Sequence, residues 1–454
     1  MATNEERLGT ASIPKLLLSL GIPTLIAQII NLLYNIVDRM YIGHIEGVGA
    51  QALTGVGVTM PVILIISAFS ALIGAGGAPL AAIALGQGDK KRAETILSNG
   101  FVVLCCISAA LMVLFYLIKK PLLYAIGGSD VTYPYAEAYL NVYLIGTLFV
   151  QLVLGLNPFI TAQGNSKIAM FSVVIGAAIN IALDPLFIFV FNMGVSGAAW
   201  ATVLSQFASA VWTVYFLISK KASLRINPAL FKPNWRLLGG VFALGISPFI
   251  MQSTESLISI VLSVGLKTYG GDLYVGSLTI LQSIMQLIHV PVSGFTQGVQ
   301  PVISYNFGAG KLDRVRKTYR IIISLCAGVS FIMTLSAMLF PGVYANMFTT
   351  DPELVALVKK VMPIFVAGML VFGVQMGCQN VFMGLGQAKI SLFMALLRKV
   401  FLLVPFAIIF PLVTGNVISI YVAECAADFI AAITCGTVFA LNIKKILARG
   451  PLQR

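Results

Sequence analysis

Acidic residues inside long apolar stretches are the first feature of this sequence that could do chemistry. A charged side chain at the centre of a hydrocarbon layer costs at least about 2.5–3.5 kcal/mol, so such residues are candidates for a functional role. Carboxylates in this setting predict the binding of a cation or a proton. Five acids qualify, and a sixth near the start of an apolar stretch is a weaker candidate: Asp38, Asp184, Glu255, Glu424 and Asp428, then Glu137.

The surroundings of Asp184 are suited to holding a cation. Asn180 lies four residues earlier and therefore on the same helical face. Pro185 follows directly, and because it lacks a backbone N–H it frees a carbonyl oxygen one turn earlier. Carboxylate, amide and carbonyl oxygens are the ligands that a hard cation prefers. Ionised, the group could hold Na⁺, and protonated it could carry H⁺; a cap or a structural pair inside a helix bundle is the alternative.

Three tyrosines lie four residues apart on one helical face: Tyr135, Tyr139 and Tyr143. Packing, or an aromatic belt at a membrane interface, is one interpretation of this pattern. The other is that a phenolic oxygen from this face reaches the carboxylates.

A second group of charges combines bases and acids. Arg398 and Lys399 lie roughly 13–15 Å into one apolar helix, counted inward from its polar end at about 1.5 Å per residue. Glu424 and Asp428 lie roughly 12 and 18 Å into the next apolar helix from the opposite side. In a hydrocarbon core about 30 Å thick these depths coincide. We therefore predict a structural ion-pair network of these four residues, with a second cation site as the alternative.

Other chemistry is not indicated. His44 and His289 have no neighbour at metal-ligand spacing, and the six cysteines form no C-x-x-C pair. Residues 307–311 (FGAGK) lack the pattern of a phosphate-binding loop, since Leu312 stands where Ser or Thr is required. We expect no metal, no cofactor and, without a nucleophile–base pair, no enzyme.

The composition indicates that membrane-spanning helices position these residues. The chain has 454 residues, of which 58% are apolar and 10% charged, with a mean hydropathy of +0.95. An average soluble domain carries about 25% charge, so a soluble enzyme and a disordered chain are excluded. A membrane-spanning helix needs roughly 20 apolar residues. Apolar runs predict an all-α integral membrane protein with twelve spans, at 14–38, 52–80, 94–118, 133–157, 166–191, 196–219, 238–266, 274–303, 318–341, 354–380, 390–412 and 417–442.

The basic residues predict the orientation. With twelve spans, most of the 29 Lys and Arg residues fall on the side of the N-terminus, and an excess of Lys and Arg marks the cytoplasmic side. We expect a multi-pass protein of the bacterial plasma membrane with both termini in the cytoplasm. This placement accounts for the net charge of +13 without nucleic acid. The N-terminus lacks the pattern of a cleaved signal, so we expect the first span to be retained.

The chain contains an internal repeat. GAPLAAIALGQGDKKRAE (77–94) matches VQPVISYNFGAGKLDRVR (299–316) at a constant offset of 222 residues. NPFITAQGNSKI (157–168) matches QNVFMGLGQAKI (379–390) at the same offset. A constant offset over some 80 residues predicts a duplicated unit.

Each repeat holds six spans, so both enter the membrane from the same side. The two bundles are then parallel and related by a pseudo-two-fold axis along the membrane normal. We predict an N-terminal six-helix lobe at 1–219, a cytoplasmic linker at 220–236 and a C-terminal six-helix lobe at 237–454. Two bundles around a central cleft are typical of transporters in which one bundle rocks against the other. A duplicated scaffold is the alternative, against which the buried charges argue.

Taken in order, these segments resemble the multidrug and toxic compound extrusion (MATE) family. The resemblance rests on ALGQGDKKRAE, NPFITAQGNSK, NIALDPLFIF, GVSGAAWATVLSQ and QPVISYNFGAGKLDRVRK, and it covers essentially the whole chain. It implies secondary active export of cationic amphipathic drugs by antiport with Na⁺ or H⁺, through alternating access of two lobes. The expected partners are small cationic drugs and membrane lipids, and we expect the chain to act as a monomer.

The resemblance also implies which residues couple transport to the ion. Matching the motifs gives a first-lobe cation site with two acids and four accompanying polar residues: Asp38, Asp184, Asn157, Asn180, Thr202 and Tyr139. One branch of the family has a second-lobe site with acids in spans seven and ten. Glu255 matches the first of these, but span ten here contains no acid, so Glu255 is a secondary candidate.

A flippase for a lipid-linked substrate is the alternative function, found in distant relatives of this architecture. A cavity rich in basic residues would favour it, because such residues bind pyrophosphate. Here only Arg398 and Lys399 lie within a span and acids predominate, so cation export is favoured.

Overall fold

The computed structural model describes residues 4–349 and 351–450, and the regular structure within them is helical. Helices suit this chain because every backbone donor and acceptor in hydrocarbon must be bonded within the protein. Among the described residues, ten helices are long and apolar enough to cross a membrane, and two bent helix pairs bring the total to as many as twelve. The prediction of an all-helical membrane protein is confirmed.

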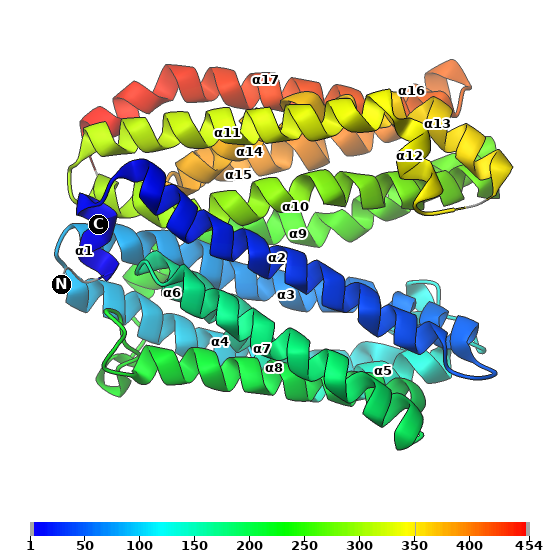
Figure 1. Ribbon diagram of the computed structural model, residues 1–454, viewed down its shortest axis with the longest axis horizontal. Coiled ribbons are helices and arrows are strands. Elements are labelled where there is room, and N and C mark those ends of the chain that lie inside the picture. The colour runs from blue at the N-terminus through cyan, green and yellow to red at the C-terminus, as the bar shows by residue number, and fades with distance from the viewer. Residues whose placement is uncertain (1–3, 350, 451–454) are drawn as a thin grey trace.

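The first half of the chain forms one bundle, drawn from blue to green in Figure 1. A short helix, α1, precedes it, and a π-helical segment, η1, interrupts its later part. Its elements are α1 (Asn4–Thr10), α2 (Ile13–Gly43), α3 (Gly49–Gly86), α4 (Lys90–Ala125), α5 (Tyr133–Ile145), α6 (Thr147–Ala162), α7 (Ser166–Pro185), η1 (Leu186–Val190) and α8 (Gly194–Ile218).

The second half forms the other bundle, drawn from lime to red in Figure 1. It too contains a π-helical segment, η3. Its elements are η2 (Pro228–Leu230), α9 (Trp235–Gly270), α10 (Asp272–Gly308), α11 (Leu312–Leu339), α12 (Pro341–Asn346), α13 (Pro352–Val366), α14 (Met369–Gly384), α15 (Ala388–Leu396), η3 (Leu397–Leu403), α16 (Val404–Thr414) and α17 (Ile418–Arg449).

The repeat is also present in the backbone. The α5–α6 pair bends by 58° and the α13–α14 pair by 41°, at Gly146 and Gly368, which are 222 residues apart. Gly88 and Gly310, separated by the same offset, adopt φ of +79° and +69°. Only glycine takes such a conformation without strain, so both turns need a glycine at this position.

The two bundles touch along the halves of their helices nearest the chain termini. A Cβ on Gly245 of α9 would lie 1.9 Å from the carbonyl oxygen of Leu72 on α3. On α2 and α10, Gln28 Nε2 donates to Gln297 Oε1 over 3.1 Å. In Figure 1, α2 slopes away from α10 towards the other end of the molecule. The contacts named here therefore close the molecule at the end that carries the termini.

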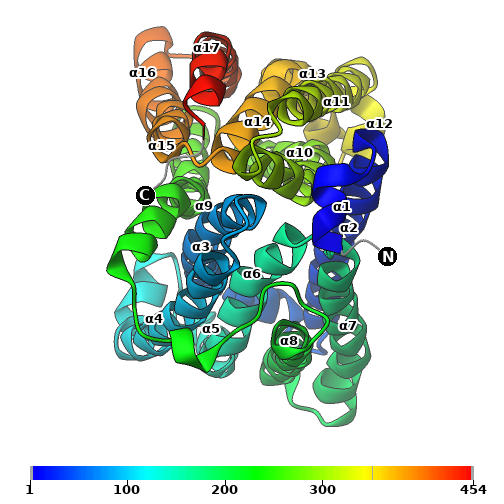
Figure 2. The same cartoon turned by 90° about the vertical axis from the view of Figure 1, so that its left-hand side faces the viewer.

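Helix α1 lies at the boundary between the two halves, as Figure 2 shows. The carbonyl oxygen of Leu8 accepts hydrogen bonds from Asn306 Nδ2 over 2.9 Å and from Arg314 Nη2 over 3.2 Å. Glu5 lies beside Ser223 in the connection between the halves. Because α1 bonds to α10 and α11 and lies against the linker, it fastens the end of the molecule where the bundles meet.

Candidate functional site

Asp38 and Asp184 meet in the first bundle. Helix α2 packs along α7, and the two carboxyl groups lie within hydrogen-bonding reach of each other. Asp38 is 8% exposed and Asp184 is fully buried. Two carboxylates in contact repel strongly where little water screens them. The pair therefore needs a proton or a cation between its oxygens.

The local fold of α7 aims Asp184 at this partner. Asn180 Nδ2 donates to Asp184 Oδ1 over 3.3 Å and to Thr202 Oγ1 of α8 over 3.5 Å. The α-helix ends at Pro185, which has no N–H to donate, and continues as the π-helical segment η1. Single-turn π segments inside helices occur frequently at functional sites.

Several oxygens around the pair are buried and receive no hydrogen bond: Asp38 Oδ1, Asp184 Oδ2, Asn180 Oδ1 and Gln206 Oε1. A buried polar atom without a partner costs about 1–3 kcal/mol, and native structures contain few of them. All four are oxygens, and they come from three helices. This donor set suits a hard cation.

Tyr34 and Gln206 complete the cluster, and neither was predicted from the sequence. The Tyr34 hydroxyl lies close to the Gln206 side chain, and the buried Tyr139 hydroxyl lies close to Thr202. Tyr34 lies one turn before Asp38, and Gln206 lies one turn after Thr202. The spacing of four residues that identified Asn180 beside Asp184 could therefore have identified both.

Asn157 is the predicted ligand that the structure leaves apart. Its Nδ2 donates to Ser172 Oγ over 2.6 Å, and Ser172 lies twelve residues before Asp184, roughly 18 Å along α7. Its Oδ1 is buried without a hydrogen bond. The structure thus brings together five of the six predicted residues: Asp38, Tyr139, Asn180, Asp184 and Thr202.

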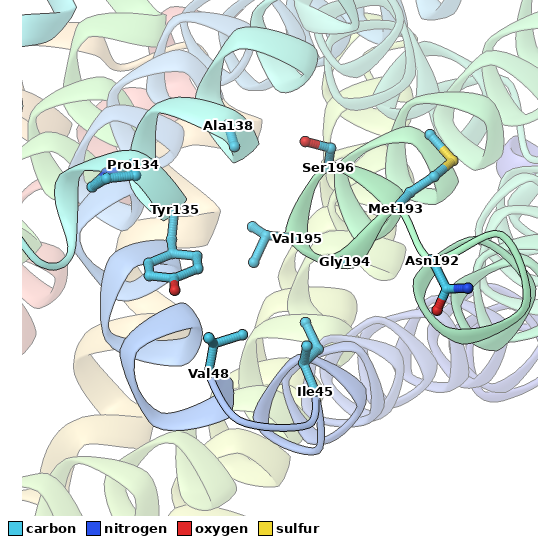
Figure 3. Close-up of a pocket in the computed structure, with 10 residues that line it drawn as sticks. All are labelled: Ile45, Val48, Pro134, Tyr135, Ala138, Asn192, Met193, Gly194, Val195 and Ser196. Atoms are coloured by element: carbon cyan, nitrogen blue, oxygen red, sulfur yellow. The ribbon is translucent and has the colours of Figure 1, made fainter.

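A cavity of about 310 Å³ lies at the end of the first bundle away from the termini. Figure 3 shows the side chains of Tyr135 and Val195 facing each other across it. Tyr135 lies one turn before Tyr139, which stacks on Tyr143 with ring centroids 6.1 Å apart. Val195 lies seven residues before Thr202, roughly 10 Å along α8. The cavity therefore lies about one turn from Tyr139 along α5 and about two turns from Thr202 along α8. It is lined by Ile45, Val48, Pro134, Tyr135, Ala138, Asn192, Met193, Gly194, Val195 and Ser196.

The second bundle holds a buried group of charges centred on Arg398. Its Nε donates to Asp428 Oδ1 over 2.6 Å, and its Nη2 lies 3.6 Å from Glu424 Oε1. The guanidinium also lies over the ring of Phe372, 5.3 Å from the centroid. The three charged side chains are between 1% and 11% exposed. Arg398 of η3 thus lies against both acids of α17.

Lys399 does not join those acids, contrary to the predicted network. Its Nζ forms an ion pair with Glu255 and donates to the carbonyl oxygen of Met251 over 3.1 Å, both on α9. Successive residues of a helix point about 100° apart. Because Arg398 faces α17, its neighbour must face another helix. The observed network therefore includes Glu255 as a third acid.

Glu137 has a different environment from the buried acids. Its Oε1 lies 2.8 Å from Lys119 Nζ, and its side chain is 33% exposed. A partly exposed acid with a lysine partner needs no bound cation. Glu137 is therefore a surface ion-pair residue.

The family profile described as MatE matches residues 23–186 and 248–409. Among curated proteins, the chain is 26% identical over 415 residues to the multidrug export protein MepA of Staphylococcus aureus, with 90% of each chain covered. It is 25% identical over 424 residues to the MepA protein of Staphylococcus haemolyticus, with 93% of each covered.

Solved structures share the fold. The chain matches an outward-facing conformation of a multidrug resistance MATE family transporter of the MOP superfamily with a TM-score of 0.90 and 23% identity. It matches a MOP superfamily transporter from Pyrococcus furiosus with a TM-score of 0.91 and 23% identity. Each match covers 98% of this chain and 99% of the other.

Proposed function

The chain belongs to the MatE family of membrane transporters, and we propose that it exports cationic amphipathic drugs in exchange for Na⁺ or H⁺. The Staphylococcus relatives are multidrug export proteins, which supports drugs as the substrate class. The observation that supports coupling to a cation is the buried pair of Asp38 and Asp184. Asp38 Oδ1 and Asp184 Oδ2 receive no hydrogen bond. That pair requires one positive charge in the closed bundle.

The coupling follows from this charge requirement. A proton or Na⁺ enters from the side of the cavity beside Tyr135 and neutralises the acidic pair, which relieves the repulsion between Asp38 and Asp184. Once the site is neutral, one bundle can rock against the other, and the site then faces the opposite side of the membrane. The excess of Lys and Arg on the side of the termini assigns that end to the cytoplasm. Because the bundles touch at that end, we assign this conformation to the outward-facing state.

A flippase for lipid-linked pyrophosphate has less support. Such a substrate needs unpaired basic side chains, and the two buried bases of the second bundle already have acidic partners. Arg398 pairs with Glu424 and Asp428, and Lys399 pairs with Glu255. The three acids outnumber the two bases, so this part of the protein attracts cations.

The proposal can be tested with purified protein in lipid vesicles. Ethidium movement is followed by fluorescence under an imposed Na⁺ gradient and, separately, under a pH gradient. We expect one gradient to drive ethidium transport and Asp184→Asn or Asp38→Asn to abolish the gradient-driven part. Asp313→Asn, which changes a carboxylate that is 95% exposed on α11, is the matched control and should transport normally.

Two results would contradict the proposal in different ways. If neither gradient drives ethidium through the wild-type protein, cation export is wrong. If the Asp184→Asn and Asp38→Asn variants retain full gradient dependence while folded normally, the coupling site lies elsewhere.

A further inference from the structure

We infer that Lys399 is a tethered counterion of Glu255, which a cationic substrate must displace in order to bind. This inference rests on the proposed export of cations and goes beyond it by naming a residue that sets substrate affinity. Four observations carry it: the exposure of Glu255, the burial of Lys399, an unpaired acceptor behind Lys399, and the charge of the whole group.

Glu255 is exposed on a face of α9 that does not face lipid. The apolar exposed residues of the same stretch are Leu257, Ile260 and Val264. At about 100° per residue they lie roughly 140–200° around the helix from Glu255. Ser259, one turn away on the Glu255 side, accepts a hydrogen bond from Gln282 of α10 over 3.4 Å. Glu255 therefore lies on the face of α9 turned towards other helices, and its side chain is 63% exposed there.

Lys399 approaches Glu255 from inside the bundle. Its side chain is 7% exposed, and the carbonyl oxygen of Met251 holds its ammonium group beside the carboxylate. The Met251 side chain is in turn fixed by Gln379 Nε2, 3.0 Å from its Sδ. A lysine held in this way presents one cation to an acid that solvent and substrate can reach.

A second position for the ammonium group exists on the other side. Asp428 Oδ2 is buried and receives no hydrogen bond, because Arg398 binds only Oδ1. Glu424 and Asp428 are close enough to Lys399 for their charges to act on it. The four bonds of a lysine stem allow the ammonium group to move between neighbouring acids.

The charges of the group make the exchange favourable. Three acids and two bases leave one net negative charge when Lys399 is paired with Glu255. If a cationic substrate takes Glu255, Lys399 can turn to Asp428, and two bases then face two acids in the buried part. Each negative charge has a partner in that state. The price of substrate binding is the loss of the Lys399–Glu255 pair.

Ethidium binding to the purified full-length protein in detergent tests this inference by fluorescence anisotropy. An ion pair whose acid is exposed to solvent contributes little, so we expect Lys399→Met to lower the Kd for ethidium about fivefold. Glu255→Gln should raise the Kd. In the Glu255→Gln background, Lys399→Met should leave the Kd for ethidium unchanged, because the carboxylate that Lys399 neutralises is already absent. Lys389→Met removes an exposed lysine ten residues earlier, and it should leave the Kd unchanged.

Loss of Lys399 leaves two buried acids, Glu424 and Asp428, beside a single buried base, Arg398, so a second variant guards against misfolding. Lys399→Met combined with Asp428→Asn keeps the buried charge balanced, and it should bind ethidium as tightly as Lys399→Met. Wild-type binding together with an unchanged Kd in both Lys399 variants overturns the inference and leaves export intact. An equal tightening in the Glu255→Gln background also overturns it. If wild type and all variants fail to bind ethidium, the proposed export falls and this inference falls with it.

Discussion

Replacing Arg398 by methionine should destabilise the protein far more than removing either of its partners. Methionine fills much of the same volume over the Phe372 ring, but it leaves Asp428, 1% exposed, and Glu424, 6% exposed, without their base. Breaking a buried ion pair from one side costs about 3–5 kcal/mol. Asp428→Asn leaves Arg398 paired with Glu424, so it should cost only about 1–2 kcal/mol, the value of one hydrogen bond to a charged group.

The double variant Arg398→Met, Asp428→Asn separates pairing from packing. It removes one charge of each sign, so we expect a total loss of about 1–3 kcal/mol, well below the sum of the single losses. Unfolding free energies from titration with sodium dodecyl sulfate in mixed micelles, followed by circular dichroism, provide the measurement. Lys90→Met, at a surface pair 3.9 Å long with Lys90 55% exposed, is the control and should cost at most about 1 kcal/mol. Additive losses in the double variant would refute the pairing.

Three further outcomes are expected. Tyr34→Phe removes the hydroxyl beside Gln206 in the acidic cluster and should weaken the apparent affinity for the driving ion about tenfold in vesicle transport. Gly245→Ala should lower the melting temperature in detergent because its methyl group would meet the Leu72 carbonyl, whereas Gly328→Ala, with open space around it, should not. Burial raises the pKa of Glu5 above its ordinary 4.5, so the α1 contacts should be most stable below pH 4.5 and weaken as the pH rises past the raised value; hydrogen exchange of α1 should show this dependence in wild type and not in Glu5→Gln.

The membrane fold could be predicted from the sequence because hydrocarbon imposes a simple rule. Only long helices satisfy the backbone there, so apolar runs locate the spans directly. The repeat could also be predicted from the sequence, because turns that need glycine, such as those at Gly88 and Gly310, keep their spacing in both halves. The bends at Gly146 and Gly368 were not predicted, because a glycine inside an apolar run gives no indication of whether the helix continues straight.

The candidate site was predicted as far as spacing along one helix allows. Asn180 and Asp184 share a face, and that relation is fixed by the helical period. Which neighbouring helix supplies the remaining groups depends on how helices cross, and spacing carries no information about this. Matching the motifs of the resembled family puts Asn157 beside Asp184, although its amide contacts α7 three turns away. Matching depths pair Lys399 with α17, although it faces α9.

The repeat offset relates the two polar sites residue by residue. Thr202 and Gln206 of α8, shifted by 222, coincide with Glu424 and Asp428 of α17. In both bundles these positions of the last helix face the buried polar group. Thr202 accepts a hydrogen bond from Asn180 and Gln206 lies beside Tyr34, while Glu424 and Asp428 form ion pairs with Arg398. The duplication has therefore kept the location of a polar site in each bundle while its charges diverged.

The divergence determines which bundle depends on an added cation. Shifted back by 222, Arg398 and Lys399 coincide with Gly176 and Ala177 of α7, so the first bundle has no base at the matching positions. Its acids must take their positive charge from a proton or an ion that arrives from outside. The second bundle brings its own cations on η3, and there an outside cation must compete with Lys399 for Glu255. We therefore propose that the duplication has given one site that the driving ion loads and releases, and another whose cation is a side chain of the protein itself.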